Sequence, residues 1–296
     1  MKKYLILATL LVILGGLTIT MTACSKNFNF NTLFGNSFEE KAVEVEGSFN
    51  SIEIHTDTAD ITLISSDDGK CRVVSNDRKK IEYSAISEDG ALKIKSTDTR
   101  KWYERMFSFG APTLTVYLPK EDFASLIIDE STGNIKVTDN FNFATLNIKV
   151  STGNVILENI TADSVSVETS TGKIDMKDTA CTGEITLKVS TGDTYLHSVR
   201  CKNLTSTGNT GDISVTNVIA EGKFDIERST GDVNFDSSDA AEIYVKTDTG
   251  NVKGTLLSDK VYIVSSDTGK IDIPKTITGG RCEISTNTGN IKISVK

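Results

Sequence analysis

The side chains that could carry chemistry recur in one five-residue pattern, in which Ser-Thr-Gly precedes a polar and then an aliphatic residue. The pattern is first seen at residues 131–135 and returns with small variations, so that it surrounds nine glycines in all. These are Gly133, Gly153, Gly172, Gly192, Gly211, Gly231, Gly250, Gly269 and Gly289. An isolated Ser-Thr-Gly is no catalytic signal, and nine copies argue against a single nucleophile. Spacings of 19 or 20 residues instead predict a stacked repeat protein.

Two roles are open for this repeated pattern. Glycine permits a positive φ angle or a close backbone approach, and short polar side chains before it hydrogen bond a turn, so we predict a structural turn at each of the nine glycines. Stacked along one edge, the same side chains could also form a track for a glycan or ordered water.

A metal-binding reading of the pattern is weaker. Asp193, Asp212 and Asp232 directly follow their glycines and could form a cation stripe. Lys173 and Lys270 occupy the same position in other copies, however, and the Gly-Gly-x-Gly-x-Asp calcium repeat is absent. We therefore predict neither a metal nor another cofactor.

Cysteine and histidine offer little further chemistry. Cys181 and Cys201 both lie nine residues after their glycines. They are either small buried corner residues with free thiols, or, if this position stacks between coils, a disulfide pair about one rung apart. His55 and His197 lack a cluster of cysteines or carboxylates at ligand spacing, which indicates surface or packing roles. So few histidines also weaken a case for acid–base catalysis.

Two short strands must position each turn. Apolar residues stand seven and five places before the glycine and two and four places after it, as Leu146, Ile148, Val155 and Leu157 do around Gly153. This alternation is typical of strands that bury one face. One coil cannot offset its ordering entropy, whereas stacked coils share a continuous core. We predict an all-β, single-domain parallel β-solenoid with coils of about 20 residues and two strands.

The chain divides into four predicted segments. Residues 1–23 form a signal peptide, with two lysines before an apolar run, and residues 24–46 form a lipidated tether. Residues 47–121 form irregular β coils, of which the first, at 48–66, has Ala59 in place of the glycine. Residues 122–296 form the regular repeats.

An aromatic insertion interrupts the irregular coils at residues 99–112. It carries Trp102, Tyr103, Phe107 and Phe109. These side chains either cover the first coils, because an open solenoid end invites pairing with another chain, or contact a partner such as a carbohydrate or membrane.

The N-terminus also predicts where the protein resides. Ala23-Cys24 is similar to a bacterial lipobox, which predicts Cys24 as the lipid attachment site, although Met21 stands where leucine is commoner. An uncleaved signal anchor is an alternative, because residues 4–23 could just cross a hydrocarbon core that needs about 20 residues. Simple secretion is another. All three export the rest of the chain, and we predict anchoring on the outer face of the bacterial cytoplasmic membrane.

Charge limits the class of partner. The formal net charge is −8 and no basic stripe is present, which excludes a typical nucleic-acid binder. We expect an envelope protein, peptide or glycan as the partner, in addition to the membrane.

Three features together resemble a known bacterial family. They are Phe49-x-x-Ile52-x-Ile54, the strand 114–118 followed by Pro119, and the recurrent Ser-Thr-Gly-Asn/Asp-Ile. Over about residues 44–296 the chain resembles a family of adhesin-like proteins of unknown biochemical function. The resemblance implies a right-handed β-solenoid on exported proteins and a link to envelope stress, and it supplies no catalytic residues.

The combined prediction is a non-enzymatic, adhesin-like binding or scaffolding module of the cell envelope, with a role in the envelope-stress response. The alternatives are an enzyme that acts on polysaccharides and a passive structural spacer.

Overall fold

A computed structural model describes residues 38–78, 81–101 and 111–296 of this 296-residue chain. Apart from Lys101, these residues belong to one compact unit, Phe38–Arg100 with Gly110–Lys296. The second unit, Met1–Ser37 with Lys101–Phe109, lies outside the described residues except for Lys101. No helix within the described ranges is long and apolar enough to cross a membrane.

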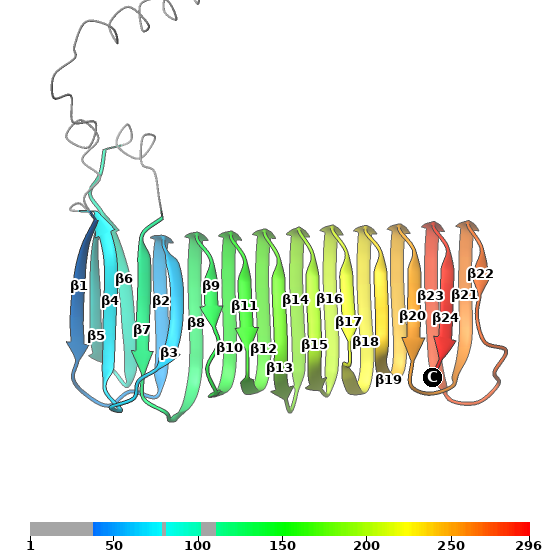
Figure 1. Ribbon diagram of the computed structural model, residues 1–296, viewed down its shortest axis with the longest axis horizontal. Coiled ribbons are helices and arrows are strands. Elements are labelled where there is room, and N and C mark those ends of the chain that lie inside the picture. Colours follow the sequence, from blue (N-terminus) through cyan, green and yellow to red (C-terminus); the bar gives the residue numbers. More distant parts are fainter. Residues whose placement is uncertain (1–37, 79–80, 102–110) are drawn as a thin grey trace, which may run out of the picture. The chain divides into compact units, whose positions relative to one another are not determined.

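The regular part is a stack of parallel coils, and Figure 1 shows them side by side. The strands that precede the turn glycines form one ladder: β8 (Asp122–Thr132), β10 (Phe141–Thr152), β12 (Ile160–Thr171), β14 (Glu184–Thr191), β16 (Asn203–Thr210), β18 (Ile219–Thr230) and the later part of β19 (Val233–Thr249). The strands that follow the glycines form the opposite ladder: β9 (Ile135–Val137), β11 (Val155–Glu158), β13 (Ile174–Cys181), β15 (Thr194–Cys201), β17 (Ile213–Thr216), the start of β19 and β20 (Val252–Leu256). The predicted parallel β-solenoid is confirmed.

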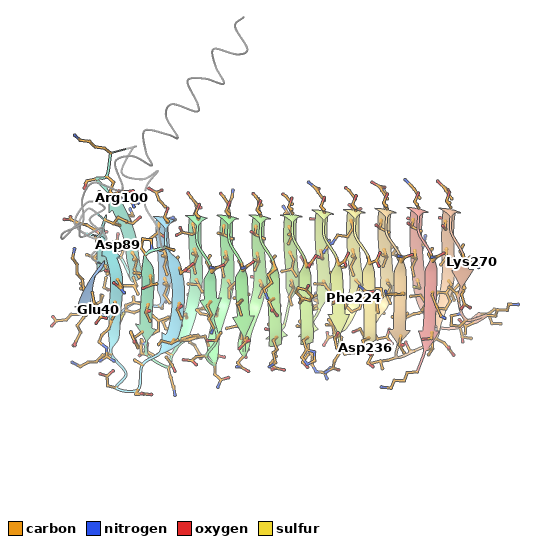
Figure 2. The ribbon with its side chains drawn as sticks, turned by 45° about the horizontal axis from the view of Figure 1, so that its top comes forward. Glu40, Asp89, Arg100, Phe224, Asp236 and Lys270 are labelled. Carbon is orange, nitrogen blue, oxygen red and sulfur yellow. The ribbon has the colours of Figure 1, made fainter. Side chains whose placement is uncertain are left out.

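Register follows the glycine spacing. Leu146 pairs with Val165 and Ile148 with Val167, so that equivalent inward positions lie above one another. These side chains are at most 2% exposed, and they belong to one continuous hydrophobic cluster. Phe224, labelled in Figure 2, lies inside the same stack and is fully buried. The core therefore runs through the coils without interruption.

Five of the coils have a third, short side that the two-strand prediction omits. Six residues after the glycine, the backbone turns a second corner in the left-handed region, with φ between +48° and +58°. Asn159, Asp178, Ser198, Asn217 and Ser237 hold this corner. Asparagine, aspartate and serine suit it because their short polar side chains hydrogen bond locally. The residues two and three places beyond this corner pair between coils, as Thr161 with Ala180 and Ala162 with Cys181 do, so these coils are three-sided.

At the N-terminal end the chain adds antiparallel strands to the parallel stack. The strands there are β1 (Phe38–Val45), β2 (Ser51–Thr58), β3 (Asp60–Ser65), β4 (Cys71–Arg78), β5 (Ile81–Glu88), β6 (Ala91–Asp98) and β7 (Thr113–Leu118). β2 and β3 stack directly on β8 and β9, while β6 and β7 form the next coil outward. β5 pairs antiparallel with β6, and β4 pairs antiparallel with β7 and β1. Antiparallel strands thus end the parallel stack.

At the C-terminal end the spatial order of the last two coils is reversed. β23 (Gly280–Thr288) and β24 (Ile291–Val295) pair directly with β19 and β20. β21 (Lys260–Thr268) and β22 (Ile271–Asp272), which come earlier in the sequence, pair with β23 and β24 and form the outermost rung. Figure 1 shows the red strands between the two orange ones. Glycine spacing alone does not reveal this reversal, because either order preserves the ladder.

Candidate functional site

The turn glycines lie in one column where backbone meets backbone. A Cβ atom placed on any of the nine would come within 1.8–2.1 Å of a carbonyl oxygen of the neighbouring coil. Eight of them have φ between +131° and +159°, which other residues rarely adopt. Ala59 occupies the corresponding place on the next coil, where its amide donates to Thr132 O and its carbonyl faces Gly133. Ala59 thus takes the place of the turn glycine in the first, degenerate repeat that the sequence suggested.

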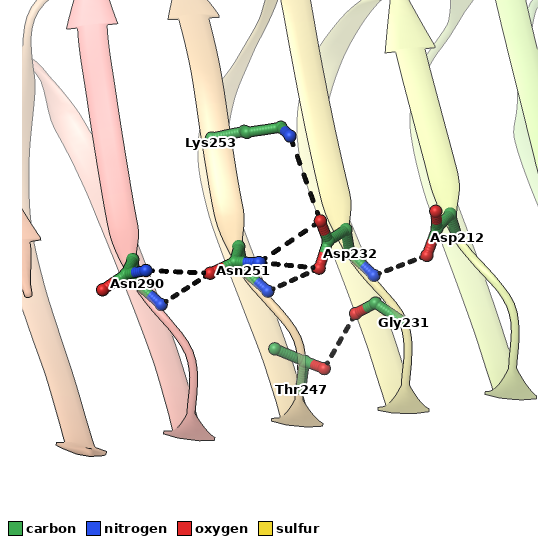
Figure 3. Close-up of polar contacts among 7 residues, drawn as sticks. All are labelled: Asp212, Gly231, Asp232, Thr247, Asn251, Lys253 and Asn290. Carbon is green, nitrogen blue, oxygen red and sulfur yellow. Dashed lines mark hydrogen bonds and ion pairs between the residues drawn. The ribbon is translucent and has the colours of Figure 1, made fainter. Parts of the chain in front are cut away.

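A hydrogen-bonded ladder runs beside the glycines, through the carboxylate and amide side chains that follow most of them, and Figure 3 shows the part from Asp212 to Asn290. Asn251 donates its backbone amide and Nδ2 to Asp232 Oδ1, at 2.8 and 3.1 Å, and Asn290 does the same to Asn251. The backbone amides of Asp232 and Asp212 donate to the Oδ1 atoms of Asp212 and Asp193, respectively. Each carboxylate or amide thus caps the next turn.

The aspartates are engaged in this ladder. Tyr195 donates its hydroxyl to Asp193 Oδ2 at 2.9 Å, and Lys253 Nζ lies 3.9 Å from Asp232 Oδ2. Among the residues that the structure describes, no group of three or more His, Cys, Asp or Glu side chains is placed to hold a metal ion. The geometry is that of turn capping.

A second column, of hydroxyl and amide side chains with two carboxylates, Asp248 and Asp267, lies on the solvent side of the same edge. The residues one and two places before each glycine are exposed in all nine copies. The threonines at the first of these positions are in register, as the pairs Thr152 with Thr171 and Thr171 with Thr191 show. Rungs of a parallel sheet are about 4.8 Å apart. This column, the threonine edge, is a regular series of donors and acceptors.

A buried column lies three residues before each glycine, on the inner side of the turn. Where it holds threonine, the hydroxyl donates to the glycine carbonyl of a neighbouring coil, as Thr169 does to Gly153 and Thr247 to Gly231, both at 3.1 Å. Two ionisable residues, Glu130 and Arg228, interrupt this column. The apolar periodicity of the sequence did not predict these two buried residues. A charged residue at a position that holds Thr, Val or Ser in other coils could have indicated them.

Glu130 is 1% exposed and lies against the Ala59 turn. Its carboxyl accepts hydrogen bonds from the Thr56 hydroxyl and from the backbone amides of Ala59 and Thr132, at 3.1 and 3.2 Å. Burial raises the pKa of Glu130 to about 8, and the backbone hydrogen bonds offset only part of that effect. The carboxyl is therefore protonated at neutral pH, and its role is to hydrogen bond the turn.

Arg228 is 4% exposed and makes its hydrogen bonds inside the stack. Its guanidinium donates to Ser206 O and Oγ at 3.1 and 2.9 Å, to Thr194 Oγ1 at 3.2 Å and to Glu227 O at 2.8 Å. Burial lowers its pKa to about 10. The adjacent rung holds Gly208, whose missing side chain leaves the space that Arg228 fills.

Cys181 and Cys201 lie on adjacent rungs, directly after the paired residues Ala180 and Arg200 of β13 and β15. Both are buried free thiols, so the structure contains no bridge between them. Burial raises the pKa of both thiols, that of Cys201 to about 12, which disfavours the reactive thiolate.

His55 is less isolated than its sequence neighbours indicated. Because β2 pairs with both β6 and β8, it lies between Lys95 and Asp129 in register. It lines a shallow polar hollow together with Thr56, Asp57, Ser96, Asp129 and Ser131. Sequence reasoning missed this grouping because β2 and β8 are more than 70 residues apart, as the pair His55–Asp129 shows. His197 pairs with Lys177 and Thr216 on another face.

Several predicted site residues lie outside the described residues. These are the lipid attachment residue Cys24 and the aromatic residues Trp102, Tyr103, Phe107 and Phe109.

The fold and the capped turns define a parallel β-solenoid of repeated, Asx-stabilised coils. The chain belongs to the Toastrack DUF4097 family, whose pattern matches residues 49–294. No curated protein matches the sequence.

Two solved structures illustrate the likeness. A putative lipid binding protein from Parabacteroides distasonis ATCC 8503 has 12% identity and a TM-score of 0.53, with 88% of this chain and 98% of that one covered. A putative adhesin from Bacteroides fragilis NCTC 9343 has 15% identity and a TM-score of 0.48, with the same coverage of 88% and 98%. Identity at this level concerns the fold alone.

Proposed function

We propose that this protein is a non-enzymatic, adhesin-like module of the bacterial cell envelope that binds an extended partner along the threonine edge. The observation that carries the proposal is the series of exposed threonine hydroxyls at nine turns, held in register by glycines that tolerate no side chain. A rigid series of donors and acceptors at one repeat distance suits a polymer with its own repeat. A glycan is therefore the first ligand to test, and an envelope protein or peptide is the alternative.

Binding to peptidoglycan sacculi tests the track. The triple variant Thr171→Val, Thr191→Val and Thr210→Val removes three adjacent hydroxyls but keeps the β-branched shape. We expect cosedimentation of the full chain with sacculi to fall at least tenfold. A matched control, Thr186→Val with Thr205→Val, alters paired threonines on the outer face of β14 and β16 and should leave binding unchanged. Equal binding by the triple variant, or no retention of the wild type, would contradict a glycan track.

Anchoring in the envelope is a separate part of the proposal and rests on the sequence around Cys24. Cys24→Ser should abolish metabolic labelling with a fatty-acid probe and leave the chain released or unprocessed. Unchanged labelling would refute lipid attachment, and membrane retention without processing would favour the signal anchor. Induction of the protein by cationic antimicrobial peptides is the corresponding test of a role in envelope stress.

An enzyme that acts on polysaccharides is the competing proposal, and the hollow at His55 is where it would be tested. His55, Asp57 and Asp129 bring titratable groups together there, next to Ser96 and Ser131. Release of soluble sugar from envelope glycans that is abolished by His55→Ala would favour catalysis over binding. If the chain is a passive spacer, deletion of the two coils at 154–192 should leave function intact, because the remaining rungs keep their register.

A further inference from the structure

The outermost rung at the C-terminal end, β21 and β22 with the loops on either side, is the least covered apolar part of the described chain. Eight large hydrophobic residues are exposed across the described ranges, and five lie between residues 257 and 277. They are Leu257, Val261, Ile263, Ile271 and Ile277, with exposed fractions of 39–92%.

The inward side of this rung is also incompletely covered. Tyr262 and Val264 pair with Cys282 and Ile284 of β23, which are 0% and 1% exposed. Tyr262 and Val264 themselves are only partly buried against the core. The difference arises because β21 pairs with β23 and with no strand beyond it in the described ranges. Its outer edge therefore offers unpaired backbone groups beside an open core.

The two ends of the stack carry different charges. The edge strands at the N-terminal end are β1, with three glutamates and one lysine, and β5, with two glutamates, which gives a formal charge of −4. Charged edges of this kind discourage pairing with another chain. The matching strands at the C-terminal end, β21 and β22, contain one lysine and two aspartates, which gives a formal charge of −1. Two C-terminal ends can thus meet with little net repulsion, and a C-terminal end gains no attraction from the acidic N-terminal strands.

We infer that the β21 edge is an interface with a second copy of this chain, related by a two-fold axis, in which two β21 strands pair antiparallel. Such an isologous contact places the same surface on both sides and closes after two copies. It joins the two open cores and satisfies the edge backbone groups, which is how one sheet edge recruits another strand.

The side chains also select the pairing register. With the axis at Tyr262, Val261 lies opposite Ile263 of the partner subunit on the outer face. In the same register, Asp259 lies opposite Ser265 of the partner subunit, and Asp267 lies opposite Leu257 of the partner subunit. With the axis one residue later, at Ile263, Asp259 would lie opposite Asp267 of the partner subunit. Like charges directly opposite are destabilising, whereas paired β-branched residues are favourable. The Tyr262 register is therefore the one expected.

Cysteine cross-linking of the full chain in the membranes of expressing cells tests the interface. In a Cys282→Ala background, which removes the thiol that pairs with position 262 in the same chain, Tyr262→Cys places two thiols on the axis at the separation of directly opposed strand residues, which suits a disulfide. We expect a dimer on a non-reducing gel after mild oxidation. Ile86→Cys, at an exposed residue of β5 at the other end, is the matched control and should give monomer. A dimer from Ile86→Cys but not from Tyr262→Cys would overturn the inference.

A second measurement does not depend on a cysteine. We expect purified full chain in a density-matched detergent to sediment with the mass of two chains at 50 μM, and Ile263→Lys to sediment as one. Ile86→Lys should behave as the wild type does. Ile263 is 48% exposed, so its replacement leaves the fold intact, which circular dichroism would verify. A wild type of one-chain mass, or a dimer indifferent to Ile263→Lys, would refute the interface.

Discussion

Two ionisable side chains, Glu130 and Arg228, lie in the buried column beside the turns, and they are accommodated there in different ways. Glu130 is kept neutral by burial and bonds the turn that lacks a glycine. Arg228 stays charged and donates hydrogen bonds to carbonyl and hydroxyl oxygens of neighbouring rungs. A buried polar group costs little only when it is hydrogen-bonded, and both residues meet that condition.

Glu130 makes stability depend on pH. Its folded pKa of about 8 lies above the ordinary value of 4.5, so its contribution is fully present below pH 4.5, declines as pH rises and is lost above pH 8. Glu130→Gln keeps the two backbone hydrogen bonds to Oε1, can donate its amide to the Thr56 hydroxyl and does not titrate. We expect the unfolding free energy of the wild type, relative to this variant, to fall by roughly 2–4 kcal/mol between pH 4.5 and 8. Urea titrations at pH 4.5, 6.5, 8 and 9.5 measure it, and parallel pH profiles would contradict the assignment.

Arg228 and Gly208 are predicted to be coupled. Gly208→Val should clash with Arg228, because a Cβ at 208 would lie 3.1 Å from Arg228 Cδ, and should cost about 1–3 kcal/mol. Arg228→Thr should also destabilise, because it leaves a cavity. The double variant restores a Val and Thr pair like Val189 and Thr169 of the same column, so we expect a coupling energy of about 1–2 kcal/mol. Additive losses in urea denaturation would show that the two sites are independent.

At the scale of elements, the ladder beside the glycines stacks like charges. Asp193, Asp212 and Asp232 occupy three consecutive rungs, where each carboxylate accepts the backbone amide of the next. Asparagine in this position adds a side-chain bond, as Asn154 does to Asn134 at 3.0 Å. The ladder thus tolerates the aspartates without requiring their charge.

Asp212→Asn should therefore stabilise the stack. The new amide can donate to Asp193 Oδ1, and two repulsive contacts disappear, which together outweigh the lost attraction between Asp212 and Arg228, so we expect a gain of about 0.5–1 kcal/mol at low salt. The gain should shrink in 0.5 M NaCl because exposed charges are screened. Asp248→Asn changes an exposed aspartate off the ladder and serves as the control. Thermal unfolding at both salt concentrations measures the effect, and a loss of stability would indicate that the carboxylate is needed.

Features that repeat along the chain were predictable from the sequence. Features that depend on which strands lie next to each other in space were not. The turn glycines and inward aliphatic positions are local patterns repeated at one period, so Gly153 with Ile148 and Val155 defines a coil by itself. The second corner at Asn159 was equally readable but lay between the indexed positions. The place of His55 beside Asp129 depends on which strand lies next in space, and spacing does not encode that.

At the scale of the whole molecule, the reversed order of the last two coils predicts an unusual response to truncation. Removal of residues 280–296 deletes an inner rung and separates β21 from β19. Removal of residues 257–296 deletes both rungs and leaves a stack that simply ends at β19 and β20. We expect the shorter protein to be the more stable and less prone to aggregation, as limited proteolysis and thermal unfolding would show. The opposite ranking would mean that β21 pairs with β19 once β23 is removed.

The same reversal has a consequence for the timing of folding. A ribosome supplies β21 before β23, yet β23 must take its place on β19 before β21 has a lasting neighbour. Coils up to β20 can add one by one as they emerge, whereas residues 260–272 must wait for residues 280–295. During that delay an apolar segment stays unprotected, which makes it the expected binding region for a chaperone.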